Sequence, residues 1–325
     1  MRLATRLNGQ PDGELVVVSA DGSRCLAAGP QLPSLLAAME DWKAAQPRLE
    51  ALARRLEQGE GDRLDPASLM APMPRTWQWL DGSAFQNHGD LMQIALGHDP
   101  IENDKPLMYQ GLSHRFLGPT EDVPLPSTDH GIDFEGEYGV IVDHVPMGTT
   151  PAEAMKHIRL IVQINDWSLR TLAPAEMKTG FGWVQAKPAC SMAPFAVTPE
   201  ALGEGWRGGR VCLDLEIAWN GKWFGKANGR EMSVGFHDLV AHAAFTRDLA
   251  AGTIIGSGTV SNANYAEVGS SCISEVRAIE MIRDKGPATT SFMGFGDVVR
   301  MEGRGVDGES PFGAIEQQVV DGSAR

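Results

Sequence analysis

The sequence predicts a mostly β fold of the α+β class behind a small N-terminal α+β domain. From Pro72 onward, short apolar runs such as YGVIVDHV, LIVQIND, VCLDLEIAW and GTIIGSGTVS alternate with Gly- and Pro-rich turn signals, a pattern typical of strands. Within residues 14–28, an Asp21-Gly22 turn separates two further apolar runs, which predicts a β-hairpin. With 325 residues and 42% hydrophobic content, the chain can bury a sizeable core.

We place the N-terminal domain at residues 1–70 and the larger domain at residues 71–325. In the first domain, a Leu- and Ala-rich stretch predicts a helix from Pro33 to Gln58, interrupted at Pro47. Two more helices are expected in the larger domain, near residues 151–160 and 234–248.

Charge and composition exclude several classes of partner. Lys and Arg total 28 against 42 Asp and Glu, a net charge of -14, so neither a nucleic acid nor an anionic membrane surface is expected. The four cysteines are widely spaced and predict free, small buried residues rather than zinc ligands. Because the sequence has no signal peptide and no apolar stretch of about 20 residues, we expect a cytoplasmic protein.

The strongest local signal is the acidic run from Asp133 to Glu137, which leads into an apolar strand. Residues two apart on a strand face the same side, so Glu135 and Glu137 would present neighbouring carboxylates. Such a pair is costly unless a cation lies between them, and oxygen ligands suit Mg²⁺, Mn²⁺ or Ca²⁺ better than zinc. Taken alone, the pattern is more typical of a solvated strand face, because alternating acids are ordinary on edge strands.

A further acid, Asp166, ends the apolar run LIVQIN. A carboxylate at the mouth of a buried strand needs a partner, and either a metal or Arg170 could serve. The alternative is an Asp that caps a turn.

Together, the E-x-E strand, the NDWS-x-R segment some thirty residues later and a following Lys resemble the fumarylacetoacetate hydrolase family. The resemblance covers roughly residues 75–315 and implies that Glu135, Glu137 and Asp166 are metal ligands. It continues in GSGTVS, where Thr259 would contact substrate. It also implies a mixed β-roll catalytic domain, a divalent metal (Mg²⁺ first, with Ca²⁺ or Mn²⁺ as alternatives) and a homodimer.

Upstream, Asp81 and His88 have a spacing similar to larger family members, where the Asp completes the metal site and the His activates water. A Glu after the GSGT segment holds that His, and Glu275 is the best match, with Glu267 and Glu280 as rivals. Such a carboxylate would fix the imidazole tautomer and raise its basicity. The other seven histidines are expected on the surface or in packing.

Lys187 and Arg170 match the family residues that bind and polarise substrate oxygens. One departure concerns the leaving-group chemistry: Ala173 stands where hydrolases of the family often carry Gln. Gln185, on the same strand face as Lys187, could substitute. Ser83, Tyr109 and Phe181 are candidates for a pocket rim that sets substrate choice.

The resemblance implies hydrolysis of a carbon-carbon bond in a small 1,3-diketo or 2-oxo carboxylic acid. His88 would deprotonate water, while Lys187 and Arg170 would stabilise the oxyanion. Decarboxylation of a 2-oxo acid, hydration of 2-oxopent-4-enoate and non-catalytic binding of a metal or oxo acid are the alternatives.

Overall fold

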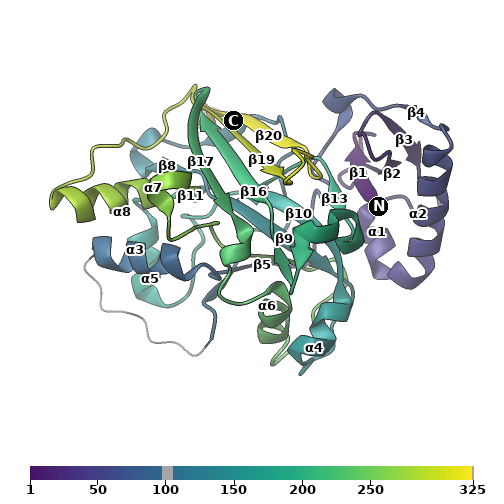
Figure 1. The fold of residues 1–325 in the computed structure, drawn as a ribbon, viewed down its shortest axis with the longest axis horizontal. Helices are drawn as coiled ribbons and strands as arrows, with labels where there is room; N and C mark the ends of the chain where they lie inside the picture. Colours follow the sequence, from purple (N-terminus) through teal and green to yellow (C-terminus); the bar gives the residue numbers. More distant parts are fainter. Residues whose placement is uncertain (97–104, 324–325) are drawn as a thin grey trace.

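Two large sheets dominate the computed structural model, which describes residues 1–96 and 105–323 (Figure 1). Within these residues the larger sheet has 11 strands and the smaller one has five. In spatial order the larger sheet contains β4 (Asp62–Arg63), β3 (Arg24–Ala27), β2 (Glu14–Val18), β1 (Arg2–Arg6), β13 (Ala196–Val197), β10 (Ile158–Asn165), β9 (Gly136–Val142), β18 (Ile254–Gly256), β5 (Trp79–Gly82) and β6 (Met108–Gln110), with β12 (Ser191–Met192) paired to β10. The smaller sheet contains β17 (Lys222–Asn228), β16 (Asp214–Trp219), β19 (Val298–Arg304), β20 (Ala314–Asp321) and β7 (Val123–Leu125).

The fold class is as predicted, because strands outnumber helices and the apolar runs form the central strands. Every residue of β9 is buried. Val140 packs in the main core with residues of the smaller sheet, whereas Ile141 packs in the core beneath the N-terminal helices. A strand covered on both faces reads as a continuous apolar run, which explains why the sequence identified it.

The N-terminal region agrees with the prediction except in its helix. The expected hairpin is formed by β2 and β3, which pair antiparallel. The expected helix is divided into α1 (Leu35–Glu40) and α2 (Trp42–Glu57) at Asp41, and the predicted interruption at Pro47 is wrong. The side chain of Asp41 accepts from the Ala44 amide and so caps α2, while Pro47 lies inside that helix.

The two helices predicted in the larger domain are shorter than expected. The first, α4 (Pro151–Ala154), ends in a 3-10 turn, and β10 begins at Ile158, because the following β-branched run pairs with β9. The second is α6 (Phe236–Ala243). Four helices were not predicted: α3 (Gln86–Leu96), α5 (Ala173–Thr179), α7 (Tyr265–Val268) and α8 (Ile273–Asp284).

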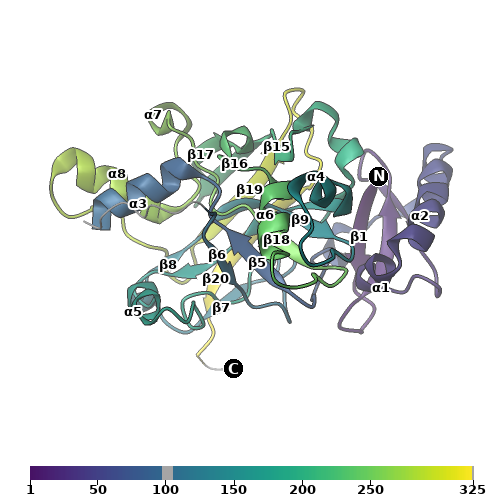
Figure 2. The same ribbon diagram turned by 90° about the horizontal axis from the view of Figure 1, so that it is seen from below.

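Helices α3 and α8 lie side by side at one end of the molecule, and α1 and α2 lie at the opposite end in both views (Figure 2). The division at residue 70 stays a prediction, since β1 pairs with β13 and both regions share one sheet and one core. A bilayer-spanning helix is absent from residues 1–96 and 105–323.

Candidate active site

Three acidic side chains converge at one end of four central strands of the larger sheet. β9 runs antiparallel to β10 and β18, and β5 runs parallel to β18, so the start of β9 lies beside the ends of the other three. This topology brings together Glu137 near the start of β9, Asp166 directly after β10, and Asp81 in β5. One carboxylate oxygen from each lies within 4.8 Å of the others, and all three side chains are buried.

Glycines allow the strands to approach closely enough to form this cluster. A Cβ on Gly256 would lie 2.3 Å from Asp81 Oδ1 and 2.4 Å from the Trp79 ring. Gly258 adopts a φ of +75°, a conformation that favours glycine, and its amide donates to Asp81 Oδ1 over 3.0 Å. The glycines of the GSGT segment therefore position Asp81.

The cluster has the properties of a site for a hard divalent cation. Both carboxylate oxygens of Glu137 are buried and have no hydrogen-bond partner among the described residues. Burial and the charge of Asp166 raise the pKa of Asp81 to about 8, and burial with the charges of Asp81 and Asp166 raises the pKa of Glu137 well above its ordinary value. An all-oxygen set of donors with excess negative charge fits Mg²⁺, Mn²⁺ or Ca²⁺.

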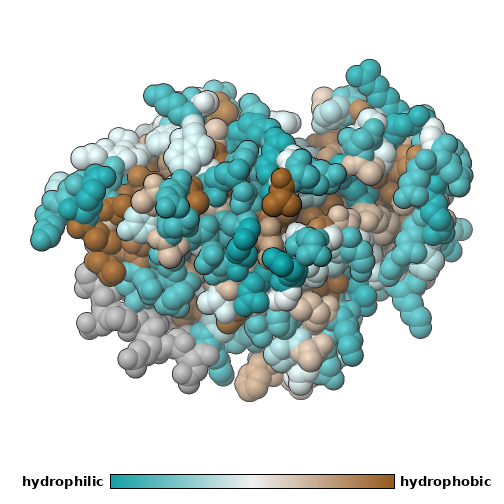
Figure 3. Space-filling model, in the orientation of Figure 1, coloured by the Kyte–Doolittle hydropathy of each residue, from teal (hydrophilic) through white to brown (hydrophobic). Residues whose placement is uncertain are grey.

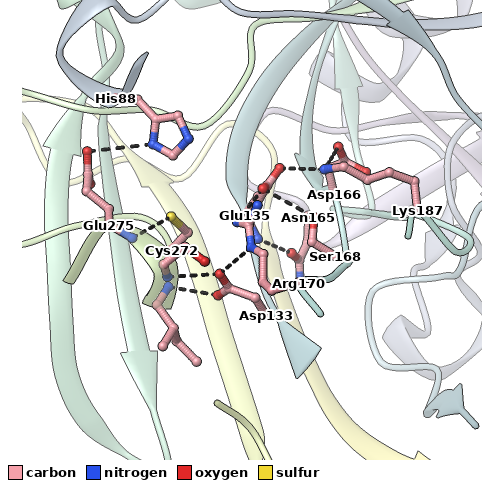
Figure 4. A network of polar contacts seen from close by, with 12 residues as sticks. His88, Asp133, Glu135, Asn165, Asp166, Ser168, Arg170, Lys187, Cys272 and Glu275 are labelled. Atoms are coloured by element: carbon pink, nitrogen blue, oxygen red, sulfur yellow. Dashed lines mark hydrogen bonds and ion pairs between the residues drawn. The ribbon is translucent and has the colours of Figure 1, made fainter. Parts of the chain in front are cut away.

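Glu135, the fourth acid of the predicted ligand set, lies beside this cluster and pairs with two basic side chains, Arg170 and Lys187. Its carboxylate accepts from Lys187 Nζ over 2.8 Å and forms an ion pair with Arg170, while Lys187 also donates to Asp166 over 2.6 Å (Figure 4). Burial opposes ionisation of Glu135, but the charges of Arg170 and Lys187 outweigh it and lower its pKa to about 2. Glu135 is thus an ionised carboxylate paired with Arg170 and Lys187. Its direct ligation of a metal remains a prediction.

Asp133 is a functional candidate that we did not predict. It is fully buried, and its carboxylate accepts from the amides of Ile273 (2.7 Å) and Ser274 (2.9 Å) at the start of α8 and from Arg170 Nε (2.8 Å). It therefore ties the arginine to the helix that carries Glu275. Its place in the acidic run was a signal, but its partners lie 37 to 141 residues away in sequence.

His88 on α3 faces Glu275 on α8 across the site (Figure 4). The distance from Nδ1 to Glu275 Oε1 is 3.7 Å, and Nδ1 has no closer polar partner among the described residues. Burial would raise the pKa of Glu275, but His88 and the hydroxyls of Ser261 and Ser270 outweigh it and lower that pKa. Glu275 is hence a buried, ionised carboxylate beside the imidazole.

The two rival glutamates lie in other contacts. Glu267 accepts from the side chain of Asn264 on the surface, and Glu280 accepts from the backbone and hydroxyl of Thr290. Of the three candidates, only Glu275 makes a polar contact with the His88 imidazole among the described residues.

Five of the charged and polar side chains of this region line one cavity of about 470 Å³: Asp81, His88, Glu135, Arg170 and Lys187. Ser83, Tyr109 and Thr259 line it, and Tyr109 donates to Asp166 over 2.7 Å. The prediction that Phe181 lies at the pocket rim is wrong, because its side chain is 96% exposed and is not among the residues that line the cavity. The prediction that Gln185 takes the place of the Gln missing at position 173 is wrong as well. Residues 181–187 form bends and irregular chain rather than a strand, and the side chain of Gln185 is exposed.

Cysteines enter the site in two places that composition did not indicate. All four are free, as predicted. However, Cys190 Sγ donates to Asp166 Oδ1 over 3.0 Å, and Cys272 caps α8 by accepting from the Glu275 amide over 3.3 Å. They are buried small residues, but they also fix two of the acids. Among the remaining histidines, His157 bonds Asp143 away from the site, and His98 lies outside the described residues.

Comparison with known proteins identifies the family to which this chain belongs. The model described as "Fumarylacetoacetate (FAA) hydrolase C-terminal" matches residues 78–320, which is well over half of the chain. The chain belongs to the fumarylacetoacetate hydrolase family. A second model, "Fumarylacetoacetase N-terminal domain 2", matches residues 1–75. The predicted family is therefore confirmed.

Individual relatives are distant. A 2,4-didehydro-3-deoxy-L-rhamnonate hydrolase from Sphingomonas sp. (strain SKA58) is 25% identical over 188 residues, which span 55% of this chain and 63% of that protein. The crystal structure of maleylpyruvate hydrolase from Sphingobium sp. SYK-6 in complex with manganese(II) ion and pyruvate covers 99% of this chain and 100% of its own, with a TM-score of 0.66 and 19% identity. A 5-carboxymethyl-2-hydroxymuconate delta-isomerase from Mycobacterium smegmatis covers 99% of both chains at a TM-score of 0.61 and 18% identity. Likeness at this level shows the shared fold.

Proposed function

We propose that this protein is a divalent-metal-dependent hydrolase that cleaves a carbon-carbon bond in a small 1,3-diketo or 2-oxo carboxylic acid. The observation that carries the proposal is that Asp81 of the buried acid cluster and His88 of the His-Glu pair line the same cavity. The unpartnered carboxylate of Glu137, with Asp81 and Asp166, would hold the cation, and Glu135 stands next to them. When bound, the cation would draw electron density from the substrate's chelating carbonyl and carboxylate oxygens.

The chain's own residues supply the remaining chemistry. Because Nδ1 of His88 faces the ionised Glu275, Nε2 is the nitrogen that can take a proton from water. The resulting hydroxide adds to the remote carbonyl carbon, and the bond to the neighbouring carbon breaks with its electron pair passing to the departing fragment as an enolate. Protonation of that enolate by the imidazolium completes the balance. Arg170 and Lys187 would stabilise the negative charge on substrate oxygens.

One feature, the His88–Glu275 pair, supports a hydrolase over a decarboxylase and over a non-catalytic binding module. Decarboxylation needs an electron sink but no water-activating base, and the half-buried His88 beside the buried Glu275 is the kind of base that hydrolysis requires. A non-catalytic binding module would not need this pair either. Isomerases share the fold, as the delta-isomerase shows for its own chain, so the products must decide the reaction class.

The test is a product assay across acylpyruvates, fumarylacetoacetate analogues, oxaloacetate and 2-oxopent-4-enoate, each with Mg²⁺, with Mn²⁺ or with a chelator. We expect a carboxylic acid and a 2-oxo acid or ketone from a diketo substrate, only when a metal is present. Release of carbon dioxide from oxaloacetate without cleavage of any diketo acid would replace hydrolase by decarboxylase. Ligand-induced thermal stabilisation without any product would indicate a binding module.

A further inference from the structure

The cavity has a second part, beyond the charged centre, whose lining is apolar. Six side chains from five segments of the chain contribute to it: Met92, Leu107, Met177, Ala278, Met281 and Phe292. Leu107 and Met177 are about half exposed (47% and 51%), which places them at the mouth. Apolar side chains gather at the end of the molecule where α3 and α8 lie (Figure 3).

Each helix around the cavity presents one face to it. On α8 the lining residues follow a spacing of three, four and seven residues: Ser274, Arg277, Ala278 and Met281. On α3, His88 and Met92 are four residues apart and share a face, and on α5, Ala173, Pro174 and Met177 do the same. The arrangement is therefore a continuous passage and not a set of unrelated surface side chains.

Helix geometry gives the length of this passage. α8 begins beside Asp133, and Met281 lies seven residues after Ser274, so it lies about 10 Å further along the helix axis at a rise of 1.5 Å per residue. By the same rise, Met92 lies about 6 Å beyond His88 on α3. A substrate whose oxygens reach Arg170 and Lys187 would thus extend its far end among methionines.

Among the described residues that line the apolar part of the cavity, Arg277 is the only charged one. Its guanidinium already has partners within the chain. It donates to the backbone carbonyl of Thr290, and its guanidinium stacks over the Phe292 ring at 4.5 Å from the centroid. An additional carboxylate at the far end of a substrate would lose hydration against apolar side chains.

We infer that the substrate's far end is an uncharged, apolar acyl group rather than a second carboxylate; this inference rests on the proposed function. Methionine side chains are flexible and polarizable, so a pocket built from Met92, Met177 and Met281 adapts to chains of different shape. The site is accordingly selective for the 2-oxo acid end and permissive for the length of the apolar end.

The experiment measures binding separately from turnover. Dissociation constants are determined by calorimetry for straight-chain 2-oxo acids from 2-oxobutanoate to 2-oxooctanoate, with Mn²⁺ and with chelator. We expect Kd to fall about fourfold per methylene, which corresponds to roughly 0.8 kcal/mol. The 2-oxo dicarboxylic acid of equal length should bind at least tenfold more weakly. The same comparison is made for kcat/KM with acylpyruvates.

Substitutions in the lining test whether these side chains cause the dependence of Kd on chain length. Met281→Ala and Met92→Ala should each reduce the fall in Kd to about twofold per methylene, since part of the apolar wall is removed. Met147→Ala is the matched control, because that methionine is 61% exposed and lies outside the cavity lining. It should leave the dependence unchanged.

Two results would overturn the inference: a Kd that stays within twofold across the series, or tighter binding of the dicarboxylic acids that Arg277→Ala abolishes. These two results can be distinguished from a failure of the proposed function. If the chain-length dependence of Kd holds but no diketo acid is cleaved, the apolar passage stands and the hydrolase proposal fails. If diketo acids are cleaved with a preference for a charged far end, the hydrolase stands and the passage fails.

Discussion

Replacing Asp133 by Ala should destabilise the protein by roughly 3–5 kcal/mol, because one buried carboxylate supports two elements of the site. Its loss leaves two amides at the start of α8 without their acceptor, worth about 1 kcal/mol as a lost cap. It also removes the 2.8 Å hydrogen bond from Arg170 Nε, and hydrogen bonds to buried charged groups contribute about 1.5–3 kcal/mol. Removing one member of a buried ion pair adds to this cost.

Urea denaturation in the presence of a chelator measures the effect without interference from a bound metal. Asp133→Asn keeps one acceptor oxygen and should lose about half as much stability as Asp133→Ala. Asp129→Ala changes an exposed acid nearby and should alter the free energy of unfolding by less than about 0.5 kcal/mol. If Asp133→Ala costs less than about 1 kcal/mol, the reasoning that Asp133 anchors both α8 and Arg170 is refuted.

Three further predictions concern the site. His88→Ala should lower kcat for a cleaved diketo acid by about 10²–10⁴-fold while Mn²⁺ binding is retained; an unchanged kcat would contradict the role of His88 as the base. Mn²⁺ affinity should rise by about tenfold per pH unit for each proton released, and so by up to about 100-fold per unit between pH 6 and pH 8, because Asp81, with its pKa raised to about 8, and Glu137 must lose protons to bind the ion; calorimetry showing constant affinity would contradict this. Gly256→Ala should destabilise the protein by roughly 1–3 kcal/mol in urea, since its Cβ would lie 2.3 Å from a carboxylate oxygen, whereas Gly89→Ala, in open space within α3, should stabilise by up to about 1 kcal/mol.

The strands that position the acids could be predicted because they are buried on both faces. β9 and β10 therefore read as long apolar runs, and the acids at their ends stood out against them. The pairing of Glu275 with His88 also followed from the expected order of the motifs, although two other glutamates had similar positions in the sequence. The signal for the acids was contained within a few neighbouring residues, whereas the choice of Glu275 depended on the order of motifs along the chain.

What could not be predicted depends on contacts between distant residues. α8 begins at a cysteine cap, and the acceptor for its first amides is Asp133, 140 residues earlier, so no local capping pattern marks it. The role of Cys190 as a donor to Asp166 has the same origin. The loop after α5 looked like a strand, yet Glu176 holds it in bends by accepting from three of its backbone amides.

The central claim is that the acids at the end of the central strands bind one hard divalent cation. Titration of the metal-free protein with Mn²⁺, followed by calorimetry, tests it most directly when wild type is compared with Glu137→Gln and with the exposed control Glu204→Gln. We predict one Mn²⁺ per chain in wild type and in the control, and at least 30-fold weaker binding in Glu137→Gln. Absence of Mn²⁺ binding in wild type, or equal affinity in all three proteins, would contradict the claim.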